Sequence, residues 1–306
     1  MSSNPTAAPR RLLLCGAGRV VERYYAPALL RSPDFRVEAV VDPSPERRTW
    51  ASTTFAAPAY GSIDEALAAH AFGAALVVTP PQAQPDLVLA LLSRGLPVLV
   101  EKPGALSIAE AGRLVTAADS LPLRMALVRR YWQRYERLKQ RLGGKPDAWS
   151  IELETNPGAW GHVDGAQASG IEGLIYDLLP HAYDIAVSSL GAGLSEPAGG
   201  ALADDRVTLW FDSARTQTIS IRHGDTYIER VTAQRDGRSF ASEPSQVASI
   251  AERLAIRARL QRPEQEVAFD RLLASFADDL RNGVRNDDLI GCAELIERVK
   301  ALGRAG

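Results

Sequence analysis

Cysteine, methionine and histidine are scarce in this sequence of 306 residues, which has two, two and four of them respectively. Cys15 and Cys292 lie far apart, which excludes a dense disulfide framework and a cysteine-based metal knuckle. His70, His162 and His223 show no ligand spacing with cysteines or carboxylates. We therefore expect no metal site.

Long apolar runs and a strong net charge are also lacking. No run reaches the ~18 to 20 apolar residues that a bilayer crossing needs. The formal net charge of −2 gives no field that favours nucleic acid or an anionic membrane. We expect a cytoplasmic protein with no membrane or nucleic-acid partner. Residues 1–9 are polar and contain proline, and we expect a flexible tail there rather than a secretory signal.

One segment, residues 129–141, mixes basic and aromatic side chains, a composition also found in nucleic-acid-binding segments. Tyr131, Tyr135, Leu138 and Leu142 form an apolar stripe at helical spacing, with the arginines around it. With no net positive charge on the chain, the pattern favours an amphipathic helix.

The first 125 residues alternate between short apolar segments and segments with helical periodicity. This alternation indicates βαβ crossovers and a parallel sheet covered by helices on both faces. Ser62 and Glu65 form a capping-box pattern at the start of one of the helices. We predict a doubly wound Rossmann domain over residues 10–125, with its ligand crevice at the C-terminal strand ends. The expected strands lie within residues 11–18, 35–42, 74–80, 96–103 and 121–128, and the helices within 20–32, 44–52, 62–70, 81–95 and 107–119.

After about residue 145 the pattern changes to strands in which apolar and polar residues alternate, as in a half-exposed antiparallel sheet. Helical patterns follow the strands. We predict a second, α+β domain with an open, mainly antiparallel sheet. Its strands are expected within residues 148–155, 205–212, 216–223 and 226–233, and the later helices within 245–261, 267–283 and 286–303.

A glycine pair follows the first predicted strand and precedes a predicted helix. Gly16 permits a tight turn, and Gly18 lets the backbone approach a pyrophosphate at the helix N-terminus. We expect a dinucleotide to contact both glycines together with Arg19 and Val20. The third glycine of the G-x-G-x-x-G fingerprint is replaced by Val21, so a plain glycine turn stays an alternative.

The choice between NAD and NADP depends on the end of the second strand. Asp42 lies where a carboxylate bonds the adenosine ribose and repels a 2′-phosphate, although it also suits a helix cap. Ser44, Arg47 and Arg48 follow, and they are able to accommodate a phosphate. We favour NAD, leave NADP open, and include Arg47 among the cofactor residues.

Three segments, residues 16–29, 40–48 and 77–103, resemble the Gfo/Idh/MocA family of NAD(P)-dependent oxidoreductases. The resemblance covers nearly the whole chain, including the closing helices, and it is weakest in residues 185–245. It implies hydride transfer between a nicotinamide and a sugar-like or small cyclic alcohol or carbonyl compound. It also implies a substrate and oligomerisation domain over residues 126–285, a last helix (286–306) that packs on the Rossmann domain, and a homodimer or homotetramer formed through the C-terminal sheet.

The resemblance assigns further cofactor residues to two loops. Thr79 and Pro80 match the loop beside the nicotinamide ribose, and Glu101 and Lys102 match the family's E-K-P motif. The lysine of that motif contacts the reacting oxygen, where an ammonium stabilises negative charge. Without the resemblance, E-K-P reads as a turn with solvated charges. The family often has Asn and His in place of Pro81 and Gln84, which puts contacts from the first loop in doubt.

The segment Gly173–Ile185 matches the family's D-x-x-x-H helix. Asp177 and His181 are four residues apart and share a helix face. Histidine, with an ordinary pKa near 6.5, suits a general acid/base, and Asp177 would orient the substrate. Because Pro180 fits a helix best in its first turn, we expect the helix to begin near residue 177. Leu179 stands where the family has glycine, a change that would narrow the pocket or shift the helix.

The remaining expectations concern substrate contacts and alternatives. Arg129, Tyr131 and Trp160 are candidate substrate contacts, whereas Asp184 is expected to make structural contacts. Three functions stay open: a dehydrogenase or reductase of a sugar-like compound, a reductase of imines or other carbonyls in specialised biosynthesis, and a dinucleotide-binding regulatory protein without turnover. A buried Asp/His pair that serves packing alone is the structural alternative for Asp177 and His181.

Overall fold

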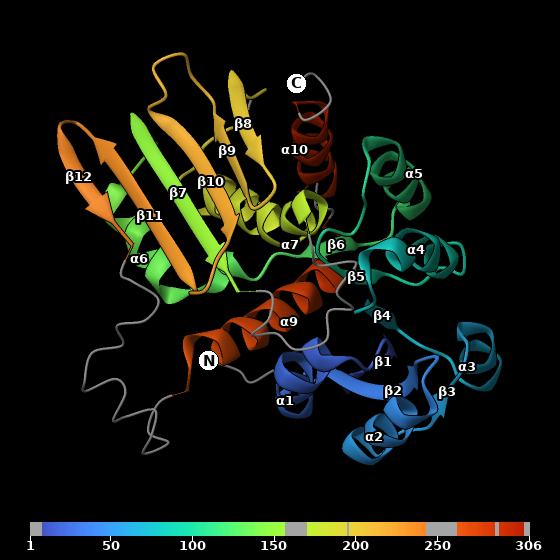
Figure 1. Cartoon of the computed structure of the whole chain (residues 1–306). Helices are drawn as coiled ribbons and strands as arrows, with labels where there is room; N and C mark the ends of the chain where they lie inside the picture. The colour runs from blue at the N-terminus through green and yellow to red at the C-terminus, as the bar shows by residue number, and fades with distance from the viewer. Residues whose placement is uncertain (1–7, 157–169, 195, 243–261, 285–287, 303–306) are drawn as a thin grey trace, which may run out of the picture. The chain divides into compact units, whose positions relative to one another are not determined.

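The structure, a computed structural model, describes residues 8–156, 170–194, 196–242, 262–284 and 288–302 (Figure 1). The chain divides into two compact units. Unit 1 takes its described residues from Met1–Ala105, Ala109–Ala126 and Gln265–Leu289. Unit 2 takes its described residues from Leu106–Ile108, Leu127–Glu264 and Ile290–Gly306.

The sheet of unit 1 is parallel throughout, as predicted. Its strand order is β3-β2-β1-β4-β5-β6, and the order reverses between β1 and β4, where α/β folds bind ligands. Four of the six strands carry long runs of buried apolar residues, as a sheet covered on both faces requires. The strands are β1 (Arg10–Cys15), β2 (Phe35–Val41), β3 (Ala59–Tyr60), β4 (Ala74–Val77), β5 (Val98–Glu101) and β6 (Leu123–Ala126).

The helices of unit 1 follow the predicted segments. At the start of α3 the Ser62 hydroxyl accepts the Glu65 N–H at 3.3 Å, while the Glu65 carboxylate accepts from Gly61 N–H rather than closing the full box. Val21 is fully buried, and the chain there winds as a π-helix. The helices are η1 (Val21–Tyr25), α1 (Ala26–Arg31), α2 (Pro45–Phe55), α3 (Ile63–Ala69), η2 (Pro81–Ala83), α4 (Gln84–Leu92), α5 (Ile108–Ala118) and α9 (Glu264–Asn282).

The long helix α9 belongs to unit 1 although it comes late in the sequence. Phe269 stacks on Tyr24 and meets the Tyr25 ring edge-on, and Phe276 stacks on Phe35 of β2. These aromatic contacts explain why residues 265–289 group with the N-terminal part of the chain.

The sheet of unit 2 is mixed and mainly antiparallel, in the order β12-β11-β7-β10-β9-β8. One pair, β7 with β10, is parallel. Figure 1 shows the strands side by side, with α6 and α7 on one face of the sheet. The open, mainly antiparallel sheet is thereby confirmed. The strands are β7 (Ala148–Thr155), β8 (Gly199–Ala203), β9 (Arg206–Trp210), β10 (Gln217–His223), β11 (Ile228–Arg235) and β12 (Arg238–Ala241).

Helices α6 and α7 of unit 2 pack against this sheet. In the basic–aromatic segment, Tyr135, Leu138 and Leu142 are buried, which supports the amphipathic-helix interpretation. The helices are η3 (Arg129–Tyr131), α6 (Gln133–Leu142), α7 (Gly170–Asp184), η5 (Ile185–Ser189) and α10 (Asp288–Leu302). The expected helix within residues 245–261 lies outside the described residues.

The expected start of the D-x-x-x-H helix is wrong. Helix α7 spans Gly170–Asp184, so Pro180 lies inside it rather than in its first turn. An interior proline removes one helix hydrogen bond at a cost of about 3 kcal/mol. The burial of Leu174, Leu178 and Leu179 offsets this cost, since each buried leucine contributes about 1.5–3 kcal/mol.

Helix α10 begins in unit 1, where Leu289 Cδ1 would lie 2.6 Å from a methyl group at Gly104, and its residues from Ile290 on belong to unit 2. The packing of the last helix on the Rossmann domain stays a prediction. The Lys300 ammonium donates to the Tyr176 hydroxyl at 2.6 Å, and Glu297 accepts the Ile108 N–H at 2.9 Å. Helix α10 also packs closely on α7, because a methyl group at Gly291 would lie 2.4 Å from the Tyr183 hydroxyl.

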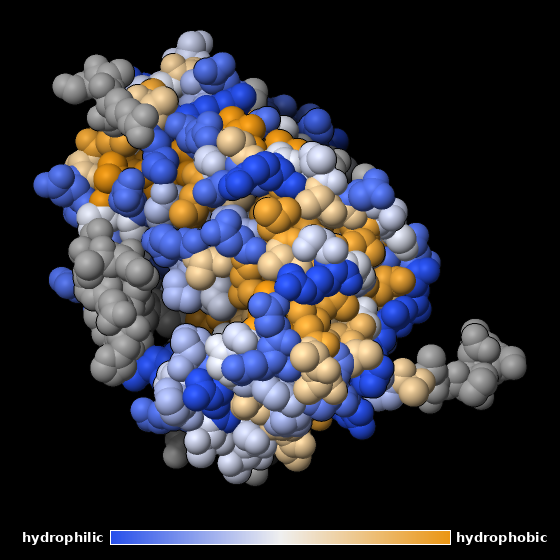
Figure 2. All heavy atoms as spheres, turned by 90° about the vertical axis from the view of Figure 1, so that its right-hand side faces the viewer, coloured by the Kyte–Doolittle hydropathy of each residue, from blue (hydrophilic) through white to orange (hydrophobic). Residues whose placement is uncertain are grey.

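Large apolar side chains are rarely exposed on the described part of the chain; those that are exposed are Val20, Leu30, Ile108 and Val284. On the face in Figure 2, hydrophobic residues (orange) lie among hydrophilic ones (blue). Within the described ranges, none of the helices combines the length and the apolar character that a bilayer crossing requires.

Candidate functional site

The glycine loop after β1 has a backbone that only glycine adopts without strain at its first position. Gly16 has φ +96°, and a methyl group there would lie 2.1 Å from the Val78 carbonyl oxygen. At Gly18, no heavy atom of the described residues lies within 4 Å of such a methyl position, so the loop is open on that side. Arg19 and Val20 are exposed directly after it. The loop therefore leaves room for a pyrophosphate at the helix N-terminus.

Asp42 ties the glycine loop to the end of β2. Its carboxylate accepts the Ala17 N–H and the Ser44 N–H, each at 2.8 Å, and the residue is only 9% exposed. A carboxylate oxygen accepts more than one hydrogen bond, so Asp42 retains capacity for ribose hydroxyls. Ser44 rather than Asp42 caps α2, so the helix-cap interpretation of Asp42 is wrong, while its role as a ribose ligand stays a prediction.

The two arginines beyond Asp42 have different partners. Arg47 pairs with Glu22, with Nη1 and Oε2 3.1 Å apart. Arg48 donates Nη1 to the Asp42 and Pro43 carbonyl oxygens, both at 2.9 Å. Ser44 caps α2 by accepting the Arg47 N–H at 3.3 Å. The turn therefore carries one arginine matched by a carboxylate and one bound to carbonyl oxygens.

A residue whose role the sequence left open, Gln84, joins two loops of the site. It is 1% exposed, and its Nε2 donates to the Thr79 carbonyl oxygen at 3.0 Å and to the Lys102 carbonyl oxygen at 3.5 Å. Its Oε1 accepts the Gly104 N–H at 2.9 Å. Gln84 therefore holds the loop after β4 against the E-K-P loop, in the position where the family often has histidine.

Glu101 fixes the backbone at Lys102. Its carboxylate accepts the Tyr25 hydroxyl at 2.7 Å and the Lys102 N–H at 3.0 Å. Burial and the charge of Glu101 raise the pKa of Tyr25 well above its ordinary value, so this hydroxyl stays a donor. Glu101 is thus placed as a support for the loop, while the Lys102 side chain is half-buried beside it.

The sheet edge of unit 1 fits a bound dinucleotide. The glycine loop, Asp42, Thr79, Pro80 and Lys102 follow β1, β2, β4 and β5, and parallel strands bring these ends to one edge. The buried Thr79 Oγ1 has no hydrogen-bond partner among the described residues, as expected of a group that awaits a ligand. Cys15, beside the loop, is no nucleophile, because burial raises its pKa to about 12.

In unit 2, α7 presents Asp177 and His181 on one face. Both are half-buried, whereas the residues between them and the three after His181 are buried. Leu179 is fully buried, about 200° around the helix from Asp177, and so points into the core. It therefore does not occupy the face of the helix that carries the Asp/His pair.

The structure adds His223, to which the sequence assigned no role. It ends β10, and α7 packs against β10. Burial lowers the pKa of His223, while the charges of Asp177 and Asp205 oppose this shift. The charge of Asp177 thus acts on His223. Only the packing of α7 against β10 could have revealed this, because 46 positions separate the two residues in the sequence.

Arg129 lies in a buried polar network rather than in open solvent. It donates to the Tyr227 hydroxyl at 3.0 Å, pairs with Glu229 at 3.2 Å, and stacks 3.9 Å from the Trp132 ring centre. The Tyr135 hydroxyl also donates to Glu229. Burial opposes the charge of Arg129, yet Glu229 holds the pKa of this arginine above its ordinary value.

Asp184 makes structural contacts, in agreement with the expectation. It is fully buried and accepts the Arg130 Nε at 2.7 Å and the Arg130 N–H at 3.0 Å. This pair fastens η3 to the C-terminal end of α7. Tyr131, the third residue of η3, is half-buried beside it, and Trp160 lies outside the described residues.

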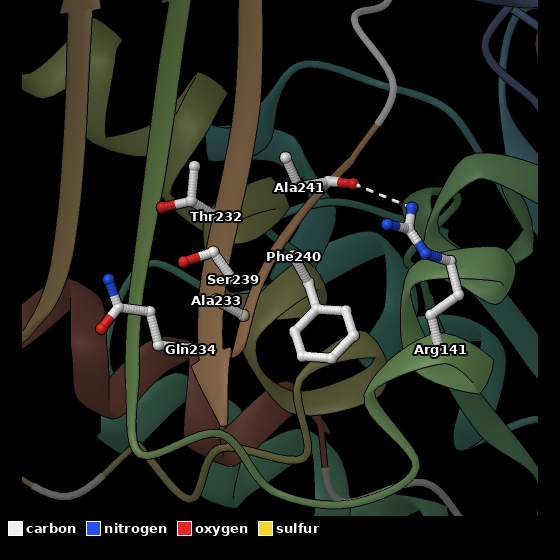
Figure 3. A pocket seen from close by; sticks show the side chains of 7 residues that line it. All are labelled: Arg141, Thr232, Ala233, Gln234, Ser239, Phe240 and Ala241. Atoms are coloured by element: carbon white, nitrogen blue, oxygen red, sulfur yellow. Dashed lines mark hydrogen bonds between the residues drawn. The ribbon is translucent and has the colours of Figure 1, made fainter. Parts of the chain in front are cut away.

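A cavity of about 550 Å³ lies elsewhere in unit 2, where α6 approaches β11 and β12 (Figure 3). Arg141 points across it toward the Ala241 carbonyl oxygen at 3.5 Å. None of the predicted site residues lines this cavity. Across the described residues, no group of three or more His, Cys, Asp or Glu is placed to hold a metal ion.

The fold and the residues at its sheet edge define a dinucleotide-binding protein with a second α+β unit. Residues 10–128 match the model of the Gfo/Idh/MocA oxidoreductase family, described as having an NAD-binding Rossmann fold. This match agrees with the resemblance drawn from the sequence.

Two curated relatives match a third of the chain. An inositol 2-dehydrogenase of Leifsonia xyli subsp. xyli is 33% identical over 107 residues, 34% of this chain and 32% of that protein. An inositol 2-dehydrogenase of Streptomyces avermitilis is 39% identical over 111 residues, 35% of this chain and 32% of that protein. The match thus spans about a third of the length of these relatives.

A solved structure shares the fold over nearly the whole chain. GenD2 from gentamicin A biosynthesis, in complex with NAD, has a TM-score of 0.80 at 17% identity, covering 99% of this chain and 97% of that chain. At this identity the likeness shows the fold of the chain alone.

The Gln84 contacts predict a loss of stability on substitution. Gln84→Met keeps the side-chain length but leaves the buried Gly104 N–H and two carbonyl oxygens without this partner. We expect the free energy of unfolding to fall by about 1–3 kcal/mol in urea denaturation. Gln82→Met, at an exposed position of η2, is the matched control and should be neutral. Equal stability of the two variants would contradict the role of Gln84.

Proposed function

We propose that this protein is an NAD-dependent dehydrogenase of a sugar-like or small cyclic polyol. The observation that supports this most is the sheet edge of unit 1, which gathers the Gly16–Gly18 loop, Asp42 and Lys102. When bound, NAD supplies the hydride acceptor. Residues of this chain determine the substrate, the direction of the reaction and the stereochemistry of hydride transfer.

Lys102 serves as the cation at the reacting oxygen. Its backbone is fixed on both sides, by Glu101 at its N–H and by Gln84 at its carbonyl oxygen. A positioned ammonium stabilises the negative charge that develops on an alcohol oxygen as its proton leaves. Glu101 and Gln84 act on this step through the position of the lysine.

His181 serves as the general base for the hydroxyl proton in oxidation and as the acid in reduction. Asp177, one turn earlier on the same face of α7, holds the substrate hydroxyl and the charge of the imidazolium. In this proposal Lys102 stabilises the reacting oxygen, His181 takes its proton, and Asp177 orients the substrate through a neighbouring hydroxyl. Arg129 is a positioning residue, and Tyr131 remains a proposed substrate contact.

Inositols are the proposed first substrates to test. The two relatives that match a third of the chain are named inositol 2-dehydrogenases. A cyclic polyol offers vicinal hydroxyls, one for the Lys102/His181 pair and another for Asp177. The carboxylate of Asp177 and the imidazole of His181 form hydrogen bonds with such hydroxyls, which an apolar substrate lacks.

Asp42 supports NAD over NADP as the cofactor. Its carboxylate is fixed at the end of β2 by two backbone N–H groups, where it meets ribose hydroxyls and repels a 2′-phosphate.

A substrate panel tests the proposed function. The purified protein is incubated with NAD and, one at a time, with myo-inositol, scyllo-inositol, common aldoses and non-cyclic polyols, and NADH absorbance is followed. NADH formation with at least one cyclic polyol is the expected result. Tight NAD binding with no NADH from any member would point instead to a regulatory dinucleotide-binding protein.

We further propose that the open face of the unit 2 sheet joins two copies of this chain. That face carries half-exposed polar pairs, Ser150 with Thr232 at 2.7 Å and Glu152 with Arg230 at 3.0 Å. Such groups suit a polar interface between sheets. Light scattering after size exclusion should give a dimer or tetramer, and Arg230→Glu should shift it toward monomer. A wild-type monomer at micromolar concentration would contradict the proposal.

A further inference from the structure

We propose that Glu22 is a specificity determinant that disfavours a 2′-phosphate on the bound dinucleotide, because it holds Arg47 in an ion pair. This inference rests on the dinucleotide binding proposed above and concerns residues of unit 1 alone. It identifies a side chain that adds to the preference for NAD that Asp42 supports.

Glu22 connects the two parts of the site that meet the adenosine end. It lies one turn after the glycine loop, where its N–H donates to the Gly18 carbonyl oxygen at 3.0 Å. Its carboxylate reaches Arg47 of α2 at 3.1 Å. The ion pair therefore spans from the helix after the glycine loop to the helix after β2.

Arg47 stands where an arginine accommodates the 2′-phosphate of NADP. It is the third residue of α2, and its N–H is bound by Ser44, whose own N–H donates to Asp42. With Glu22 on its guanidinium, the positive charge is already matched. A phosphate would have to displace this carboxylate and approach Asp42 as well.

The other charged groups of the turn do not duplicate Glu22. Arg48 donates to the Asp42 and Pro43 carbonyl oxygens, which orient its guanidinium. These neutral oxygens do not compensate its positive charge. It would supply a residual attraction for phosphate. Glu46 is exposed in the first turn of α2, and the described ion pairs join Arg47 to Glu22 rather than to Glu46. Arg19 and Arg23 lie on the helix after the glycine loop and favour any phosphate of either dinucleotide.

The effect should be modest because water reaches the pair. The side chains of Arg47 and Glu22 are 35% and 50% exposed. Solvent and salt screen such a pair, so its removal should change the preference severalfold rather than a thousandfold.

The test compares dissociation constants of NAD and NADP for the intact chain, measured by isothermal titration calorimetry at one low ionic strength. The variants are Glu22→Gln, Arg47→Gln, the double variant and the control Glu46→Gln. We expect Glu22→Gln to strengthen NADP binding about three- to fivefold and to leave NAD binding unchanged. Glu46→Gln, which removes the same charge nearby, should leave the ratio of the two constants at its wild-type value, and the double variant should lose the gain.

An unchanged ratio in Glu22→Gln, or the same gain in Glu46→Gln, would overturn the inference while leaving the proposed function intact. A gain that persists in the double variant would also overturn it, because Arg47 would then not be the group released. Failure of the wild type to bind either dinucleotide would contradict the proposed function itself. Adenosine 2′,5′-bisphosphate, which carries the 2′-phosphate without the nicotinamide, should reproduce the NADP trend.

Discussion

His181→Asn is expected to lower kcat by about 10²–10⁴-fold, the range that a positioned general acid/base contributes. Asparagine keeps a polar side chain on α7 but takes no proton near neutral pH. The dissociation constant of NAD should remain at its wild-type value, because the proposal assigns His181 to the substrate rather than to the dinucleotide. The measurement is steady-state turnover of the best substrate of the panel, with NAD binding by calorimetry.

Two controls separate chemistry from packing in this variant. His70→Asn changes a histidine bound to Tyr60 in unit 1 and should leave kcat unaltered. The melting temperature of His181→Asn should match that of the wild type. Near-normal turnover in His181→Asn would refute the assignment, and a large loss of stability would favour an Asp/His pair that serves packing.

The second large effect is expected from the substitution Lys102→Met. Methionine keeps the length of the side chain and removes the ammonium, so only the charge at the reacting oxygen is lost. We expect kcat/KM to fall by about 10²–10³-fold, as when one oxyanion stabiliser is removed. Lys139→Met, at an exposed position of α6, is the matched control and should leave kcat/KM unaltered.

A double variant tests whether the two residues serve one oxygen. Residues that act as a unit show strongly non-additive losses. The Lys102→Met/His181→Asn protein should therefore lose much less than the product of the single effects. Fully multiplicative losses would show that the two side chains act on separate steps.

The sequence predicted the parallel sheet of unit 1 well because both faces of its strands are buried, which makes each strand a compact apolar run. The two-residue β3 was missed, since Ala59–Tyr60 carries no such run. In unit 2, alternation located β7, β9, β10 and β11, but periodicity carries no information on strand direction, and the parallel pairing of β7 with β10 went unforeseen.

The start of α7 was mispredicted for a different reason. A proline rule describes the local backbone, whereas the burial of leucines around Pro180 depends on tertiary packing. The same limit applies to the site. Glycine spacing and the E-K-P and D-x-x-x-H patterns identified the residues that we propose for cofactor binding and chemistry. The supports, Gln84 between two loops and Glu22 on Arg47, depend on contacts between distant segments.

Direct transfer of deuterium tests the central claim most directly. The protein is incubated with NAD and myo-inositol, or the best polyol of the panel, deuterated at its ring carbons, and the nicotinamide product is analysed by mass spectrometry. We predict NADH that carries one deuterium from substrate carbon with the wild-type protein, and a greatly reduced amount with His181→Asn. Bound NAD that gains no deuterium from any deuterated polyol would contradict the account of this chain as a dehydrogenase.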